Sequence, residues 1–272
     1  KRRWIAATGD IDVLEQQFLK FFAIDSLDAA PSFAHSARKS RAYEKVTMAQ
    51  LAWLFRARKI AAEQIMNRYR KDSLARAIPK LHALLTAPEE ARHAARILSG
   101  CGVRFVLTEA LPGSRIDGAC FWLNDEQPVI SMSLRLDRID NFWFVLRHEI
   151  EHVLQEHGRD GGFILDRDIE TQSTERIEQE EQIANQAAAE FCVPQAELDG
   201  FIARVKPYFS EKRICLFAQR LGIHPGLVAG QLQRKLGRYD ILRKQQVKIR
   251  VIAMIPSGII LIGSGERSGM TV

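Results

Sequence analysis

The chain has 272 residues, 46% hydrophobic and 26% charged, which is ordinary for a globular protein of one or two domains. It has no apolar run near 18 residues and no apolar leader, which excludes a predicted membrane span and a predicted secretory signal. It begins with Lys1 rather than Met, as a fragment would. Four scattered cysteines without a C-x-x-C pair favour reduced thiols, so we expect a cytoplasmic protein.

The N-terminal part is predicted to be helical. Asp10 can cap a helix that starts after it, and Thr47 can cap a long helix that reaches about Arg68. The apolar periodicity of the second helix predicts that Ile65 lies on its buried side and Arg56 on an exposed basic side. Further helix starts are expected at Ser73 and Pro88, and a helix end at Gly100.

The net charge of +6 is concentrated in this part. Residues 1–98 contain 18 basic and 10 acidic side chains, about +8, whereas the remainder contains 21 and 23, about −2. Such asymmetry favours an acidic partner, either nucleic acid or an acidic protein surface. A solvated basic surface is the simpler interpretation, because runs of charge usually face water.

A small sheet is predicted next. Residues 103–107 have the composition of a strand, and residues 119–123 and 129–133 flank the turn-rich segment 124–127 as the two strands of a hairpin do. An exposed edge of this sheet could bind a peptide as an added strand.

The segment after the sheet contains an H-E-x-x-H motif made of His148, Glu149 and His152. On a helix, residues four apart lie on one face, so both imidazoles can reach one metal ion. A zinc ion held in this way leaves room for a water, and a neighbouring carboxylate can take the proton of that water. We therefore predict Zn²⁺ as the cofactor, His148 and His152 as ligands and Glu149 as the catalytic base.

An ordinary buried helix is the competing interpretation. Leu146, Ile150, Val153 and His157 fall on one side of the segment, as they would on any amphipathic core helix. A third ligand distinguishes the two interpretations. The stretch 178–193, ended by Pro194, is a predicted helix with several carboxylates.

We favour Glu181 as the third ligand, because Asn185 follows one turn later and could orient a ligand histidine through the free N–H of its ring. Glu178 is kept as an alternative ligand, although a solvated helix face is the simpler interpretation of Glu178 and Glu180. The intervening segment, 158–174, is interpreted as a loop over the site.

Two more helices are predicted near the C-terminus, from Ser210 to about Arg220 and from Pro225 to about Leu236, joined by a short turn. A hydrolytic site also needs a group that stabilises the transition state. Tyr208 and His224 are the candidates for that role. The apolar stretches 247–254 and 259–262 are strand-like and have no predicted function.

These motifs together resemble the ImmA/IrrE family of zinc metallopeptidases over roughly residues 103–236. The resemblance is carried by His148-Glu149-x-x-His152, Glu181-x-x-Ala184-Asn185-x-x-Ala188-x-x-Phe191-x-x-Pro194, and the segments 111–114, 118–122 and 221–225. Ile183 and Ala187 depart from the family pattern, which commonly has an acidic and an aromatic residue there.

The resemblance implies a zincin-type fold, zinc held by His148, His152 and Glu181, catalysis by Glu149, and cleavage of helix-turn-helix repressors or antitoxins. The basic helix near residues 47–71 resembles the segment that follows the DNA-binding domain in fused regulators of the XRE class. No helix-turn-helix is recognisable in the chain, so DNA is a candidate partner only through the basic region or a missing domain.

We therefore predict an α+β fold with a zincin-like metallopeptidase core preceded by a helical domain. The predicted division is a basic helical domain at 1–98, the metallopeptidase domain at 99–236 and a C-terminal extension at 237–272. The predicted function is zinc-dependent cleavage of a cytoplasmic repressor or antitoxin in stress response, mobile-element or toxin–antitoxin regulation. The alternative is a non-proteolytic regulatory or antitoxin protein that keeps the zinc fold and associates with DNA.

Overall fold

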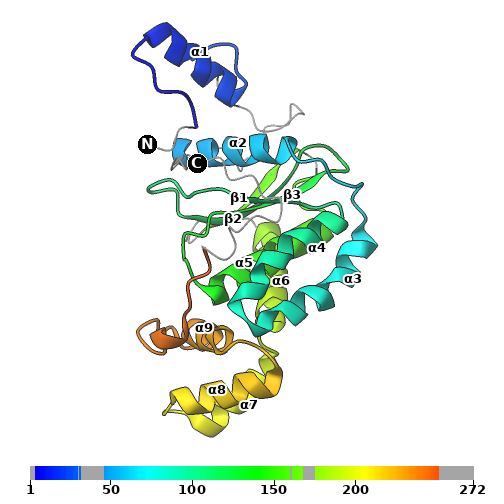
Figure 1. The fold of residues 1–272 in the computed structure, drawn as a ribbon, viewed down its shortest axis with the longest axis vertical. Helices are drawn as coiled ribbons and strands as arrows, with labels where there is room; N and C mark the ends of the chain where they lie inside the picture. The colour runs from blue at the N-terminus through cyan, green and yellow to red at the C-terminus, as the bar shows by residue number, and fades with distance from the viewer. Residues whose placement is uncertain (1–3, 30, 32–45, 160, 168–174, 251–272) are drawn as a thin grey trace, which may run out of the picture.

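A computed structural model describes residues 4–29, 31, 46–159, 161–167 and 175–250 of the chain, without the side chains of 166–167 and 175–178 (Figure 1). Within these residues the fold is α+β. The helices are α1 (Ile11–Phe22), α2 (Met48–Ala62), α3 (Lys71–His82), α4 (Ala94–Gly100), α5 (Ile139–Leu154), α6 (Glu175–Cys192), α7 (Gln195–Val205), α8 (Glu211–Leu221) and α9 (Pro225–Leu236). The strands are β1 (Arg104–Leu107), β2 (Ile116–Trp122), β3 (Pro128–Met132) and β4 (Phe163–Arg167). Short 3₁₀ turns occupy Ala83–Thr86, Pro88–His93 and Arg243–Gln245.

The four strands form one sheet in the order β1-β3-β2-β4. β1 and β3 are parallel, and the other two pairs are antiparallel. The pairing of β2 with β3 confirms the predicted hairpin. Because no strand lies beyond β1 or β4 among the described residues, these two are the edges of the sheet.

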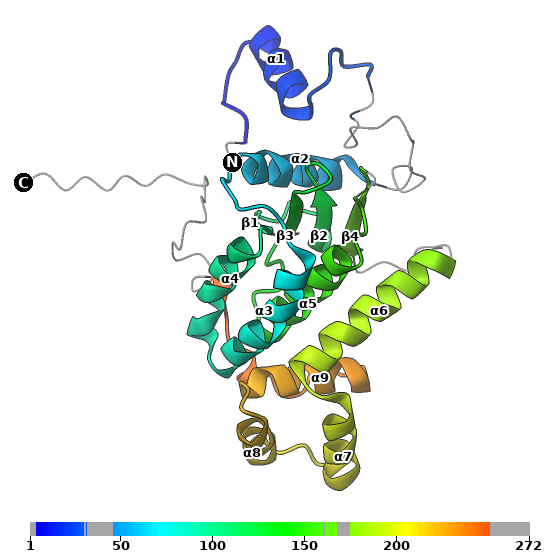
Figure 2. The ribbon, with the colours of Figure 1, turned by 90° about the vertical axis from the view of Figure 1, so that its right-hand side faces the viewer.

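Helices cover both faces of the sheet, as Figure 2 shows. Along β2, Ala119 and Phe121 pack with α2, whereas Cys120 and Trp122 pack with the cluster that contains α5. This alternation follows from the two-residue repeat of a strand. The sheet is therefore an inner layer, and α5 is buried beneath it.

α2 confirms its predicted start and is shorter than predicted. The Thr47 side chain accepts from the Gln50 backbone N–H, and the Gln50 side chain accepts from the Thr47 N–H, which forms a capping box. At the other end, Arg104 Nε donates to the Ala61 carbonyl at 3.2 Å, so a residue of β1 satisfies a backbone carbonyl in the last turn of α2. Ile65 lies beyond this end and is 99% exposed, so its predicted burial was wrong.

The predicted exposed basic face of α2 was also wrong in part. Arg56 is buried, and burial lowers the pKa of its guanidinium. α2 is buried over most of its surface because it is packed between the sheet and α1, whose Phe22 ring lies 5.3 Å from that of Phe55. Asp10 caps α1 as predicted, accepting from the N–H groups of Asp12 and Val13.

α3 and α4 pack into the same hydrophobic cluster as α5. Leu74, Leu81 and Leu98, all on the N-terminal side of the predicted boundary at residue 98, are buried together with Trp143 of α5. The hydrophobic core around α5 therefore contains residues from both sides of that boundary. The division at residues 98 and 236 stays a prediction.

β4 corrects the interpretation of residues 158–174 as a loop. Phe163–Arg167 pairs antiparallel with β2, and Phe163 is buried in the cluster beneath α2. The strand is short and follows two glycines, so local composition favoured a loop, whereas pairing with β2 decides the structure. Residues 168–174 lie outside the described residues.

α9 crosses the beginning of α5 at close range. Gly226 and Gly230 face Ile139 and Asp140, and a Cβ at either glycine would overlap those residues. Beyond α9, Val247 accepts the backbone N–H of Ile139 at 3.1 Å. In the described part of the predicted strand 247–254, which ends at residue 250, there is no strand. No helix among the described residues combines the length and apolarity that crossing a bilayer requires.

Candidate metal centre

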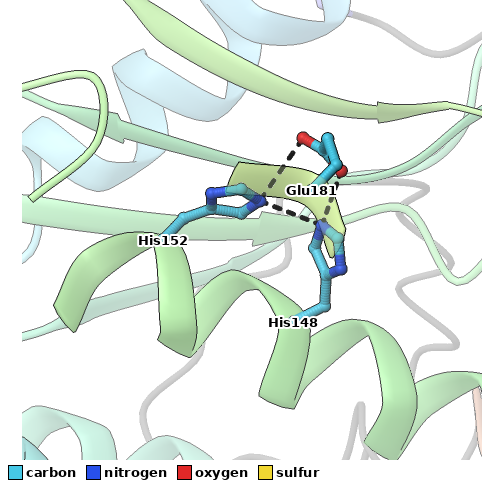
Figure 3. A group of neighbouring side chains, drawn as sticks. All are labelled: His148, His152 and Glu181. Atoms are coloured by element: carbon cyan, nitrogen blue, oxygen red, sulfur yellow. Dashed lines mark hydrogen bonds and ion pairs between the residues drawn. The ribbon is translucent and has the colours of Figure 1, made fainter. Parts of the chain in front are cut away.

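α5 brings the two predicted histidine ligands together. The helix is buried on all sides from Phe142 to Leu154, and His148 and His152 are one turn apart on it. Their Nε2 atoms lie 3.0 Å apart, and the side chains are 1% and 0% exposed (Figure 3).

α6 supplies the third residue. Glu181 Oε2 lies 3.3 Å from His148 Nε2, and Oε1 lies 3.5 Å from His152 Nε2 (Figure 3). The Glu181 side chain is 30% exposed, so solvent reaches the cluster from the α6 side. The predicted trio is therefore brought together across two helices. The side chain of the alternative, Glu178, lies outside the described residues.

The three donor atoms fit a zinc ion. Zinc bonds of about 2.0–2.2 Å at tetrahedral angles require ligand atoms roughly 3.3 Å apart. The two Nε2 atoms are 3.0 Å apart, and Glu181 places Oε2 3.3 Å from His148 Nε2 and Oε1 3.5 Å from His152 Nε2. One donor atom from each of the three residues lies within 4.8 Å of the other two. Two imidazoles and one carboxylate are also the donor set of hydrolytic zinc sites that keep a fourth position for water.

The electrostatic environment favours the metal-binding form of His152. Burial, followed by the neighbouring rings of His148 and His157, lowers its pKa to about 2. The imidazole is therefore neutral at physiological pH, and a neutral imidazole is the form that binds a metal.

Glu149 is fully buried and lies against the sheet. A Cβ at Gly118 of β2 would overlap its Oε1 and would lie 2.8 Å from Val145 Cγ1. Only glycine at this position leaves the observed space for the carboxylate. The register of β2 against β4 also shifts between Ile116 and Gly118, so the strand pairing is irregular at this point.

The role of Gly118 in making room for Glu149 was not predicted from the sequence. Its signal was a glycine inside a strand, which often marks a bulge or a close approach. The nearby Cys120 thiol is fully buried, and burial together with the Glu149 charge raises its pKa well above the ordinary value. Cys120 therefore stays protonated and is not a candidate nucleophile.

The second glutamate of the motif region, Glu151, is engaged elsewhere. Its carboxylate accepts from Arg147 at 2.8 Å and from Gln155 at 2.7 Å. Burial raises its pKa, but the hydrogen bonds from Gln155 and Arg147 outweigh burial and leave that pKa lowered. Glu151 is an ionised member of a buried pair on the same helix.

The residue that contacts a ligand ring from behind is His157, not Asn185. Asn185 is exposed on α6, and in the described structure it makes no hydrogen bond to His148 or His152. His157 Nδ1 lies 2.8 Å from His152 Nδ1. Helical periodicity placed His157 on an apolar side of α5, but α5 ends at Leu154, before that residue.

The two candidates for the transition-state donor are not brought to the metal cluster. Tyr208 is 78% exposed in the segment between α7 and α8, at the end of the molecule away from the sheet (Figures 1 and 2). His224 Nδ1 accepts from the Gly226 N–H at 3.0 Å and caps α9. Gly226 packs on Ile139, at the opposite end of α5 from His152.

Comparison with protein families agrees with this geometry. Residues 104–232 match the model of the peptidase M78 family, described as the IrrE N-terminal-like domain. A search of curated proteins found no match. The matched segment runs from the first residue of β1 into α9, and it includes the sheet, α5 and α6. The match to the IrrE N-terminal-like domain over residues 104–232 supports a member of the ImmA/IrrE family, and with the His148, His152 and Glu181 cluster it indicates a fold of the zinc metallopeptidase type.

Proposed function

We propose that this protein is a zinc-dependent endopeptidase. The observation that carries the proposal is the convergence of His148 Nε2, His152 Nε2 and the Glu181 carboxylate within 4.8 Å. Glu149, the residue after His148, supplies a second carboxylate that is fully buried beside β2. A structural zinc site needs four protein ligands and no base, so three ligands with a nearby carboxylate favour hydrolysis.

Each residue has a definite role in this proposal. His148, His152 and Glu181 hold the ion, which when bound supplies Lewis acidity to a water and to the peptide carbonyl. Glu149 takes a proton from the attacking water and delivers it to the leaving amine. Burial of Glu149 keeps its carboxylate away from bulk solvent.

The outer edge of β4 is the proposed place for the substrate. β4 is an edge strand, and its neighbour β2 carries Gly118, which lies against Glu149. A peptide added to that edge would run as a further strand, held by main-chain hydrogen bonds. Such binding selects extended segments, so we expect cleavage in a loop or an unfolded region.

The proposed substrate class is a cytoplasmic helix-turn-helix repressor or antitoxin, which rests on the resemblance to the ImmA/IrrE family. A cytoplasmic location is supported by four free cysteines, of which Cys215 is exposed. DNA is proposed only as a secondary partner, supported by the charge of about +8 on residues 1–98. Absence of binding to duplex DNA at low salt would remove it from consideration.

Glu149→Gln tests the catalytic proposal. We expect the variant to bind one zinc ion as the unsubstituted protein does, with cleavage of the candidate repressor reduced by about 10²- to 10⁴-fold. Metal content is measured by elemental analysis and cleavage by electrophoresis and mass spectrometry. Glu197→Gln, which changes a surface glutamate paired with Arg220, is the matched control and should cleave normally.

The same variant separates the peptidase from its rival, the non-proteolytic regulator. The regulatory interpretation is correct if the zinc-loaded protein binds the candidate repressor but does not cleave it. The same result is then expected for an antitoxin encoded beside this protein, and Glu149→Gln should behave like the unsubstituted protein. If the unsubstituted protein binds no zinc at all, both interpretations fail, because both require an occupied centre.

A further inference from the structure

The C-terminal end of α5 folds back on its own last turn. The His157 N–H donates to the His152 carbonyl at 2.9 Å, and the Glu156 N–H donates to the Val153 carbonyl at 3.1 Å. Glu156 has φ 59°, the left-handed conformation that completes a Schellman motif. This ending returns the chain toward the helix, so that the imidazole of His157 comes to lie against that of His152.

The contact between the two rings is close and shielded. His152 Nδ1 and His157 Nδ1 are 2.8 Å apart, and the ring centroids are 5.1 Å apart. The His157 side chain is 15% exposed. From the sheet side, Trp122 Nε1 donates to the His157 carbonyl at 3.0 Å. His157 is therefore held by the end of α5 and by β2 at once.

α6 contacts the other side of the His157 ring. Glu180 Oε1 lies 3.7 Å from His157 Nε2, too long for a direct hydrogen bond but close enough for strong electrostatic coupling. The Glu180 side chain is 18% exposed, so it does not lie on the solvated face that the sequence predicted. Consecutive residues of α6 thus point to two places: Glu181 to the metal atoms and Glu180 to His157.

The positions of the ring protons are linked through these contacts, from His152 to His157 to Glu180. An imidazole that gives Nε2 to a metal must carry its proton on Nδ1. His152 would then donate from Nδ1, so the facing Nδ1 of His157 must accept. His157 in turn carries its own proton on Nε2, the atom nearest Glu180. The tautomer of His152 therefore determines the tautomer of His157.

We propose that His157 and Glu180 are positioning residues for the metal centre: His157 accepts the Nδ1–H of His152, and Glu180 holds His157 in the accepting tautomer. This inference rests on the zinc site of the proposed function. Partners behind a ligand histidine fix the orientation and tautomer of its ring, and their loss typically weakens metal affinity by about 10- to 100-fold. Neither residue contacts the substrate or the reacting atoms.

Zinc affinity, measured by competition with a chromogenic chelator, tests the proposal without reference to catalysis. We expect His157→Leu, which removes the acceptor, to bind zinc about 10- to 100-fold more weakly. His157→Asn should stay within a few-fold of the unsubstituted protein, because its Oδ1 occupies the place of Nδ1 and accepts the same proton. Glu180→Gln should show a smaller loss than His157→Leu.

A second histidine–carboxylate pair provides the matched control. His93 Nε2 lies 3.9 Å from Glu90 Oε2, away from the cluster, so His93→Leu should leave zinc affinity unchanged. Circular dichroism of each metal-free variant shows whether the fold is retained. In the zinc-loaded protein, nitrogen-15 shifts of the imidazoles should show His157 protonated on Nε2 and unprotonated on Nδ1.

The outcomes separate this inference from the proposed function. If the unsubstituted protein binds one zinc ion and a folded His157→Leu binds it equally tightly, the positioning role is wrong and the peptidase proposal is untouched. A His157 proton found on Nδ1 in the zinc-loaded protein also overturns the positioning role. If the unsubstituted protein binds no zinc, the proposed function fails, and the positioning role fails with it.

Discussion

α2 and α5 cover opposite faces of one sheet and are both largely buried, yet they use their buried polar side chains differently. On α2, Gln50 Nε2 donates to the Ser114 carbonyl at 2.8 Å, and Trp53 Nε1 donates to the Thr108 carbonyl at 3.1 Å. On α5, the side chain of His152 meets other titratable side chains, His148 and Glu181, instead of backbone.

The difference separates a structural helix from a candidate active centre. A neutral side chain that meets one carbonyl satisfies a buried group and stabilises the fold. Several titratable groups whose donor atoms converge on one point carry a cost of burial that a bound ion would offset. Burial of polar residues alone does not distinguish α5 from α2. The two helices differ because donor atoms of α5 converge with those of Glu181 on one point.

Among the substitutions that test the comparison of α2 with α5, Gly118→Ala has the largest expected effect, because it disturbs the α5 side. The added Cβ would overlap Glu149 Oε1 and displace the carboxylate. We expect proteolysis to fall by on the order of 100-fold, as misplacement of a catalytic group by about 1 Å does, with zinc still bound in a one-to-one ratio. Gly100→Ala is the control, because its Cβ would meet nothing within 4 Å. Equal cleavage by both variants would show that Gly118 has no role in placing Glu149.

Gly230→Ala tests whether the beginning of α5 needs the close crossing by α9. Its Cβ would overlap the Asp140 side chain, so α9 must shift outward. We expect a loss of about 1–3 kcal/mol in the free energy of unfolding, typical of overpacking, measured by urea denaturation. Gly9→Ala, which meets nothing within 4 Å, should be near neutral. An unchanged urea midpoint for Gly230→Ala would mean that the crossing is not tightly packed.

Gln50→Leu tests the structural character of α2. The substitution removes the bond to the Ser114 carbonyl and the acceptor for the Thr47 N–H, so we expect a loss of about 1–2 kcal/mol in the free energy of unfolding. Zinc affinity should not change, because the bond lies on the face of the sheet opposite α5. A variant that loses zinc affinity while remaining folded would contradict the separation of the two helices.

The smallest expected effect concerns pH and His82 of α3, whose ring lies 5.4 Å from that of Phe191. Burial lowers the pKa of His82, so the folded state binds a proton less readily than the unfolded state does. The contribution of neutral His82 to the free energy of unfolding is therefore fully present above the unfolded-state pKa near 6.5, and it is lost as pH falls below that value. His82→Phe should therefore reduce the dependence of unfolding free energy on pH between about 7 and 5. Identical pH profiles for the two proteins would exclude this contribution.

Features that depend on a few neighbouring residues were predictable from sequence. Capping by Asp10 and Thr47 and the helical spacing of His148 and His152 were confirmed, because backbone sterics and local hydrogen bonds determine them. β4 was missed because a five-residue strand has little local signal until β2 supplies its partner. The burial of Arg56 and the early end of α2 were missed for the same reason, since Arg104 and α1 decide both.

By itself, the sequence determined that two imidazoles would share one helical face and that a later helix would offer carboxylates. Only the tertiary structure decided that Glu181 reaches both rings, that Gly118 makes room for Glu149, and that His157 rather than Asn185 lies behind His152. The physical reason is range. Periodicity places side chains within one element, whereas the meeting of atoms from α5, α6 and β2 depends on how those elements pack.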